Sequence, residues 1–255
     1  MPPPVPATEE IEEESAALAK LTIRFGNDMP TQQRKASNKV RTTKYTLLTW
    51  APLSLLFQFK RAANIYFLII SVLTTMSFSP KKPASMIGTF AMVLFATMLK
   101  EAYEDYQRFK SDREMNKRPA QVLDRETGVM KNCLWEDIKV GDIVKCEKDM
   151  EVPADLLCVC AQKDIVFVST MNLDGETNLK DRELAITSVK EKHLKNFTGQ
   201  VVCDEPNASL DVWDGNLSST QLGRIRSCNI KNLLLRGCTL KNSHFCYGIC
   251  LYVGA

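Results

Sequence analysis

"AANIYFLIISVLTTMSFS", residues Ala62–Ser79, decides the fold class, because no charged residue interrupts it. A second uncharged stretch, "ASMIGTFAMVLFATML" (Ala84–Leu99), follows after the short loop Pro80–Pro83. Each stretch is close to the lower limit of about 17–25 residues for a helix that crosses a bilayer. We therefore predict a transmembrane helical hairpin over residues 62–104, with spans at about 62–79 and 84–100. Two core helices of a soluble protein are the alternative.

Basic residues gather on both sides of this hairpin, whereas its loop carries only Lys81 and Lys82. Under the positive-inside rule, this bias places both termini and the domain after the hairpin in the cytosol. Asn-x-Ser/Thr sequons at Asn196, Asn207 and Asn216 would suit an extracellular domain, but the charge bias opposes that topology and we expect them to be unused. The flanking basic residues are Arg34, Lys35, Lys39, Arg41, Lys44, Lys60 and Arg61 before the hairpin, and Lys100, Arg108, Lys110, Arg113, Lys117 and Arg118 after it.

Polar segments flank the hairpin. Residues 1–30 begin with a Pro-rich and then acidic run, which predicts a disordered tail because it offers little apolar surface to offset ordering entropy. Residues 31–61 are predicted as a cytosolic basic juxtamembrane segment. Residues 105–118 continue the second span as a helical stalk that Pro119 ends, with Glu–Arg pairs at the favourable i,i+4 spacing. The pairs are Glu104 with Arg108 and Glu114 with Arg118.

Residues 119–255 contain short apolar runs separated by Gly, Pro, Asp and Asn, which predicts a mainly-β domain. A turn at Arg125–Gly128 indicates a hairpin, and "ITSVKEKHLKNF" (Ile186–Phe197) could form one short helix. The fold class expected is thus a membrane protein of α+β type, in which a two-helix transmembrane hairpin precedes a mainly-β domain. The nine cysteines lie mostly in strand-like runs without paired CxxC motifs, so we expect reduced, buried thiols and no metal site in this chain.

Composition and motifs exclude several functions. The formal net charge is only +3, so bulk electrostatics predicts no nucleic-acid partner. The sequence contains no Walker A loop, no GxGxxG and no HExxH, and neither His193 nor His244 lies in a Ser/His/Asp-like setting.

The most distinctive polar turn is "MNLDGETNLK", Met171–Lys180. Gly175 permits a positive φ angle, Asp174 favours turns, and Thr177 can bond to nearby backbone. Taken alone, these residues predict a well-formed surface turn. Glu176 could also accept a proton from a water molecule and direct that water at an electrophile, which would suit hydrolysis of an acyl phosphate.

Several segments together resemble the type IV P-type ATPases, the phospholipid flippases. "LWEDIKVGDIVKCEKDMEVPADLL" (Leu134–Leu157) is similar to their cytosolic actuator domain, and "LDGETNLK" (Leu173–Lys180) to their dephosphorylation loop, where ion pumps usually carry Thr-Gly-Glu-Ser. "NKVRTTKYTLLTWAPLSLLFQFKRAANIYFL" (Asn38–Leu68) resembles the approach to their first span, and "LLLRGCTLKNSHFCYGICLYVGA" (Leu233–Ala255) the last strands of their actuator domain. The resemblance covers nearly everything after about residue 20.

The resemblance implies that Glu176 positions and activates the water that hydrolyses an aspartyl phosphate. Gly175 would let the loop approach the phosphate, while Asp174 and Thr177 would hold the shape of the turn. The complete pump would use ATP and Mg and act on the phospholipid bilayer, with a two-span accessory subunit as partner. The sequence has no Asp-Lys-Thr-Gly signature, so the phosphorylation and nucleotide-binding domains are missing and we expect the chain alone to be inactive.

Polar residues late in the first span, Thr74, Thr75 and Ser77, lie about where relatives carry head-group-selecting residues. The expected Gln-rich or Ile-Pro pattern is absent, so head-group preference stays open, and these hydroxyls could instead bond to backbone. Two other functions also stay open: a short non-catalytic two-span protein that binds or regulates a full-length flippase, and an unrelated two-span scaffold.

Overall fold

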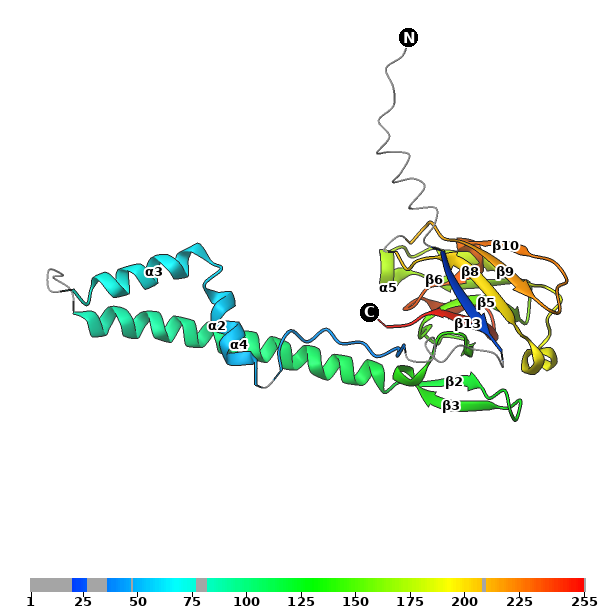
Figure 1. Cartoon of the computed structure of the whole chain (residues 1–255), viewed down its shortest axis with the longest axis horizontal. Helices are drawn as coiled ribbons and strands as arrows, with labels where there is room; N and C mark the ends of the chain where they lie inside the picture. Colours follow the sequence, from blue (N-terminus) through cyan, green and yellow to red (C-terminus); the bar gives the residue numbers. More distant parts are fainter. Residues whose placement is uncertain (1–19, 27–35, 47, 77–81, 208–209, 255) are drawn as a thin grey trace, which may run out of the picture. The chain divides into compact units, whose positions relative to one another are not determined.

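The computed structural model describes residues 20–26, 36–46, 48–76, 82–207 and 210–254. It forms two compact units, one of residues 1–40 with 116–255 and the other of residues 41–115. The first is built from β-strands and the second from helices (Figure 1). Both units follow from the patterns in the sequence, with corrections given below.

The helical unit contains α2 (Trp50–Gln58), α3 (Ala62–Leu73) and most of α4 (Pro83–Asn116). By length and hydropathy α4 could cross a membrane, and α2 with α3 would pass the same test only as one span bent by 91°. The first predicted span therefore needs correction. Within the described residues its helix covers only Ala62–Leu73, and the first two of the four predicted loop residues lie outside them.

The helix α4 runs without a break from the second predicted span into the predicted stalk and ends three residues before Pro119. The expected Glu–Arg pairs are not the ones formed. Lys100 instead contacts Glu104 at 3.7 Å and Lys110 contacts Glu114 at 3.9 Å. Both pairs are exposed, so each contributes little to stability.

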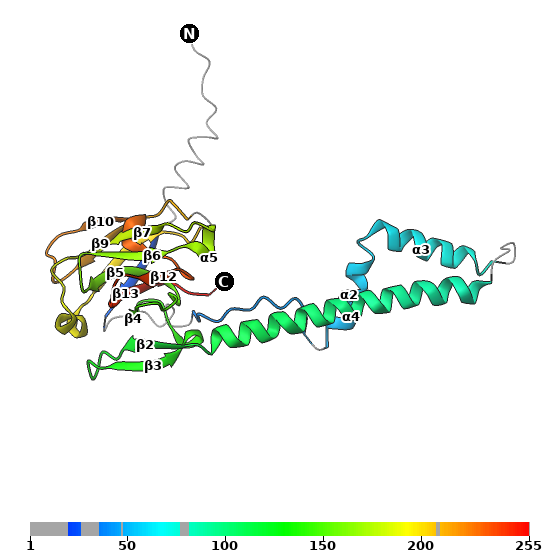
Figure 2. The same cartoon turned by 180° about the vertical axis from the view of Figure 1, so that it is seen from behind.

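The β unit contains three antiparallel sheets (Figure 2). Their strand orders are β1-β8-β9-β10, β11-β5-β13-β4-β2-β3 and β12-β6-β7. The turn Arg125–Gly128 connects β2 and β3, as predicted. The strands are β1 (Lys20–Phe25), β2 (Pro119–Leu123), β3 (Met130–Leu134), β4 (Ile143–Glu147), β5 (Asp155–Ala161), β6 (Ile165–Ser169), β7 (Leu179–Glu183), β8 (Gly199–Asp204), β9 (Asp214–Ser219), β10 (Arg226–Asn229), β11 (Leu233–Leu234), β12 (Thr239–Lys241) and β13 (Phe245–Tyr252).

Short helical segments connect some of these strands. They are α5 (Met171–Asp174) and the 3₁₀ turns η2 (Trp135–Asp137), η3 (Glu191–Asn196) and η4 (Ile230–Asn232). The short helix expected within Ile186–Phe197 is only the 3₁₀ turn η3.

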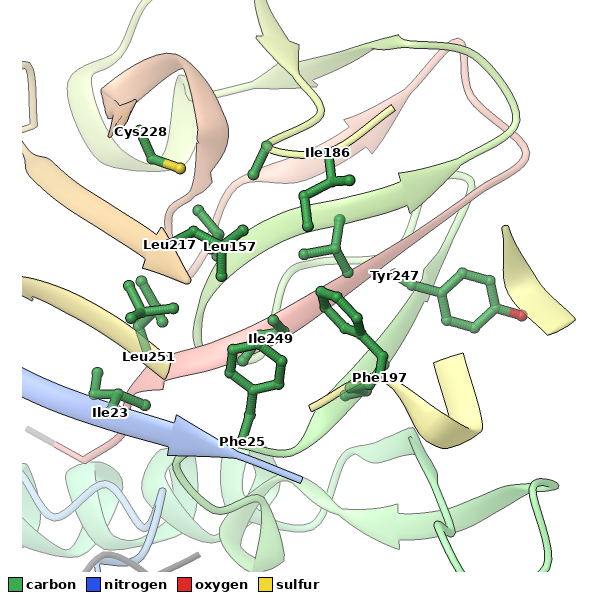
Figure 3. Packing of buried hydrophobic residues seen from close by; sticks show 14 of the residues in the cluster. Ile23, Phe25, Leu157, Ile186, Phe197, Leu217, Cys228, Tyr247, Ile249 and Leu251 are labelled. Carbon is green, nitrogen blue, oxygen red and sulfur yellow. The ribbon is translucent and has the colours of Figure 1, made fainter. Parts of the chain in front are cut away.

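The predicted disordered tail over residues 1–30 needs correction at Lys20–Phe25. These residues form β1, which pairs antiparallel with β8 along its whole length. Ile23 and Phe25 are buried while Arg24 between them is exposed, which is the two-residue period of a half-buried strand. Figure 3 shows both side chains directed from β1 toward Ile249 and Leu251 of β13. The N-terminal strand is therefore part of the core of the β unit.

The core lies mainly around the long central strands β5 and β13. Figure 3 shows part of it, in which the rings of Phe25 and Phe197 lie 5.0 Å apart between centroids. All nine cysteines are free and eight are buried, as expected for reduced thiols that pack as small apolar groups.

A second N-terminal residue is fixed in the same unit. The amide of Asn38 is fully buried and donates to the carbonyls of Trp135 and Pro153, both at 2.9 Å. Its oxygen accepts from the guanidinium of Arg236 at 3.2 Å. Since a buried polar group without partners is costly, these contacts hold residues near 38 against the β domain.

Candidate functional site

The sequence-predicted turn is the connection between β6 and β7. These strands pair antiparallel, and Ser169 lies opposite Leu179 at the last pair before the turn. The connection begins with the single turn of helix α5. Within α5, the side-chain amide of Asn172 donates to the carbonyl of Gly237 at 3.4 Å. The base of the connection is thus attached to the loop before β12, while residues 174–179 are exposed.

Gly175 ends α5 in the left-handed conformation, with φ of 76°, and its N–H donates to the carbonyl of Met171 at 3.1 Å. This is the usual role of glycine after a helix, because a β-carbon makes the left-handed region unfavourable. A β-carbon at this position would have no atom within 4 Å, so the requirement for glycine comes from the backbone angle and not from crowding.

Asp174 organises the turn. One carboxylate oxygen accepts from the backbone N–H of Glu176 at 2.9 Å, and the other accepts from the ammonium of Lys180 at 2.7 Å. The hydrogen bond from Lys180, followed by that from the Glu176 backbone, lowers the pKa of Asp174 to about 2. Asp174 is therefore ionised throughout the neutral and mildly acidic range.

Glu176 presents its carboxylate at the exposed side of the turn. Its side chain is 59% exposed, and its Oε2 lies 3.2 Å from the ammonium of Lys180. Lys180 thus contacts both carboxylates of the turn, and the pKa of Lys180 is raised, first by its hydrogen bond to Asp174. The geometry leaves Glu176 able to reach a ligand in solvent while one cation limits its motion.

The sequence had not assigned a role to Lys180, although it closes the quoted stretch six positions after Asp174. Its place on β7 could be inferred only once the turn and the strand were located. Thr177 was expected to help hold the turn, and here the expectation needs correction. Among the residues that the structure describes, the Thr177 hydroxyl has no hydrogen-bond partner, and the side-chain contacts that hold the turn come from Asp174 and Lys180.

The predicted transport-path residues lie elsewhere, after α3. The hydroxyl of Thr74 donates to the carbonyl of Ser71 at 2.8 Å, and that of Thr75 to the carbonyl of Val72 at 2.6 Å. Both hydroxyls are thus used locally. Ser77 lies outside the described residues. In the described ranges, no group of three or more His, Cys, Asp or Glu side chains could hold a metal ion.

Comparison with known families places this turn in context. The phospholipid-translocating ATPase N-terminal family matches residues 23–87, and the P-type ATPase actuator domain family matches residues 114–227, which include the turn. The chain belongs to the type IV P-type ATPases. It corresponds to their N-terminal region, and its β unit is an actuator domain, in which the N-terminal strand β1 takes part.

Curated phospholipid-transporting ATPases match most of this chain. Phospholipid-transporting ATPase 6 of Arabidopsis thaliana is 41% identical over 228 residues, which are 87% of this chain and 18% of that protein. Phospholipid-transporting ATPase IC of Xenopus tropicalis is 38% identical over 231 residues, which are 88% of this chain and 18% of that protein. The chain therefore spans less than a fifth of the length of these relatives. P-type ATPases of this kind are integral membrane proteins, in keeping with the long apolar helix α4.

Proposed function

We propose that this chain supplies the dephosphorylation loop and first membrane helices of an ATP-driven phospholipid-translocating pump, and that Glu176 is the catalytic carboxylate. The observation that carries the proposal is the exposed carboxylate of Glu176 on a turn fixed by Asp174, Gly175 and Lys180. Such a group can accept a proton from water without rearrangement of the turn.

In the proposed reaction, Glu176 accepts a proton from a water molecule. The water oxygen forms a bond to phosphorus, and the bond between phosphorus and the aspartyl oxygen breaks. Inorganic phosphate leaves and the aspartate returns to its carboxylate form, so the proton taken by Glu176 is the only one transferred to the loop. This is the second half of a covalent mechanism, in which the first half forms the aspartyl phosphate.

Lys180 has a positioning role in this proposal. Its ammonium restrains the Glu176 carboxylate and keeps Asp174 charged, so that Asp174 continues to accept the backbone N–H of Glu176. Lys180→Arg should preserve both contacts better than Lys180→Met, since only arginine keeps the positive charge.

The remaining machinery belongs to the complete pump, which by its family uses ATP and Mg. The sequence carries no Asp-Lys-Thr-Gly signature, in which the phosphorylated aspartate of such a pump would lie. We therefore expect no phosphate release from ATP by the isolated chain. Magnesium-dependent release by the purified chain above that of a Glu176→Gln variant would contradict this.

The membrane part is proposed to be a hairpin of two spans with both termini and the actuator domain in the cytosol. Thr74, Thr75 and Ser77 would lie on the lipid path, and a two-span accessory subunit would accompany the complete pump. The basic residues on either side of the hairpin support the orientation. Resistance of the β domain to protease in sealed right-side-out membranes, with cleavage after permeabilisation, would be the expected result.

The catalytic proposal can be tested in a chimera in which this chain replaces the matching N-terminal region of Phospholipid-transporting ATPase 6. Glu176→Gln should abolish lipid-stimulated ATP hydrolysis. The matched control is Glu126→Gln, which changes an exposed glutamate in the turn between β2 and β3 and should leave hydrolysis unchanged. Equal activity of the two variants would contradict the role of Glu176.

A further inference from the structure

The helix α2 has its polar side inward and its apolar side outward. Ser54 and Gln58 are its buried residues, with side chains 0% and 1% exposed. The residues Leu53, Leu56 and Phe57 are exposed, Leu56 to 65%. A helix on the surface of a water-soluble protein has the opposite arrangement, with its apolar stripe on the core. Something other than water is therefore expected to cover the outer side of α2.

The inward side of α2 is held by one carboxylate of α4. The Ser54 hydroxyl donates to Oε2 of Glu101 at 2.7 Å, and the Gln58 amide donates to Oε1 of Glu101 at 2.7 Å. At the start of α3, the amide of Asn64 donates to the backbone carbonyl of Gln58 at 2.7 Å. Since both oxygens of Glu101 are occupied, these contacts fix which side of α2 faces α4. Its apolar side cannot turn inward without breaking them.

The bend after α2 decides its direction. α2 and α3 meet at 91°, and α3 runs beside α4 in both overall views (Figures 1 and 2), with the rings of Phe67 and Phe90 6.3 Å apart. If α3 and α4 run along the membrane normal, α2 lies close to the membrane plane. The helix α3 has 12 residues and is therefore only about 18 Å long, which is shorter than the hydrocarbon core of about 30 Å.

Basic residues lie at the bend itself. Lys60 and Arg61 are exposed between α2 and α3, and the ammonium of Lys60 lies 4.6 Å from the centroid of the Phe57 ring. Long basic side chains at a membrane boundary keep their apolar stems in contact with apolar groups while their charges reach the phosphate level. Anionic lipid attracts such residues near the cytosolic surface.

We propose that α2 lies in the interface of the bilayer, with Leu53, Leu56 and Phe57 at the boundary between head groups and acyl chains and with Lys60 and Arg61 at the lipid phosphates. The segment predicted from the sequence as a cytosolic juxtamembrane segment is then partly a lipid-binding surface. Its occupant is the lipid surface itself, because α3 and α4, the helices predicted to cross the bilayer, also expose large apolar side chains such as Ile69 and Phe95. The proposal does not depend on the chemistry of Glu176.

Trp50, the first residue of α2, is a natural probe of depth, since it lies about two helical turns before Phe57 on the same side. The full chain would be reconstituted in phosphatidylcholine vesicles containing phosphatidylserine, with bromine on the acyl chains either near the carbonyl or near the chain end. The fluorescence of Trp50 is the difference between the parent and a Trp50→Phe variant, because the other tryptophans are buried in the β unit.

We expect quenching of Trp50 by the shallow bromine and much less by the deep one. Absence of quenching by both would place α2 in water, and stronger quenching by the deep bromine would make it part of a span; either result would overturn the proposal.

A substitution tests whether the apolar side holds α2 in place. Leu56→Glu should reduce shallow quenching of Trp50 several-fold, whereas Ile225→Glu, which charges a similarly exposed residue of the β unit, should leave it unchanged. Circular dichroism would establish that both variants keep their secondary structure. Unchanged quenching in folded Leu56→Glu would show that the apolar side does not bind lipid and would overturn the proposal.

Discussion

Gly175→Ala is the substitution that tests the local structure of the proposed catalytic turn most cleanly. Gly175 has φ of 76° and an added β-carbon would meet nothing within 4 Å, so the alanine is penalised by backbone conformation alone. The left-handed region costs an ordinary L-residue about 1–2 kcal/mol. The lower entropy of the unfolded alanine chain returns about 0.4–1 kcal/mol. We therefore expect a net loss on the order of 1 kcal/mol in the free energy of unfolding of the β domain.

Gly223 supplies a matched control. It lies in the exposed turn between β9 and β10, with φ of 61° and no atom within 4 Å of an added β-carbon. Gly223→Ala should therefore cost a similar amount while leaving the turn at Gly175 intact. Gly175→Asn should recover most of the loss at Gly175, because asparagine enters the left-handed region more readily than alanine.

The assay is urea unfolding of the full chain in detergent, followed by the fluorescence of Trp135 and Trp213, which are buried in the β domain. The measured quantity is the shift of the transition midpoint at constant slope. If Gly175→Ala left the midpoint unchanged while Gly223→Ala lowered it, the result would mean that the turn at Gly175 can leave the left-handed conformation without loss of stability. The account of how this turn is fixed would then be refuted.

Four further predictions concern the β domain. Leu157→Ala removes a fully buried core side chain of β5 and should lower the free energy of unfolding by about 2–5 kcal/mol, measured by the same urea assay. Gly248→Ala should also destabilise the β domain, because its β-carbon would lie 2.6 Å from a side-chain carbon of the neighbouring strand. An unchanged midpoint in either variant would contradict the packing. Lys180→Met should raise the pKa of Asp174 from about 2 toward the ordinary value near 4, measured by carbon NMR of the carboxyl group. Because the folded pKa is the lower one, the stabilisation from this carboxylate is complete above about pH 4 and is lost as the pH falls through about 2. Burial raises the pKa of Cys133 to about 11, so this thiol should react slowly with iodoacetamide at pH 8 until the chain unfolds, and rapid native labelling would contradict that environment.

The sequence predicted the mainly-β domain well because its evidence is local. Apolar runs bounded by turn residues predict strands such as β5 and β13, and the turn Arg125–Gly128 predicted the hairpin between β2 and β3. The same logic predicted the turn at Gly175, where only the backbone angle matters. Residue types at short spacing were sufficient in these places.

Other features depend on contacts between distant residues. β1 is a strand because β8, about 180 residues later, offers it a partner and a core. The side of α2 that faces α4 depends on Glu101, more than 40 residues away, which accepts hydrogen bonds from Ser54 and Gln58. Lys180 acquires its role only when the turn brings its ammonium to Asp174. Such pairings leave no periodic signal within one segment, so reading the sequence could not find them.

The central claim, that Glu176 activates the water in dephosphorylation, is tested most directly by a single-turnover measurement. In the chimera described above, the aspartyl phosphate would be formed from labelled ATP, ATP would then be removed, and decay of the labelled phosphoenzyme would be followed. Removal of a general base costs about 10²–10⁴-fold in rate, so Glu176→Gln should form phosphoenzyme and lose it at least about 100-fold more slowly than the parent and Glu126→Gln. Decay at the parental rate would contradict the claim.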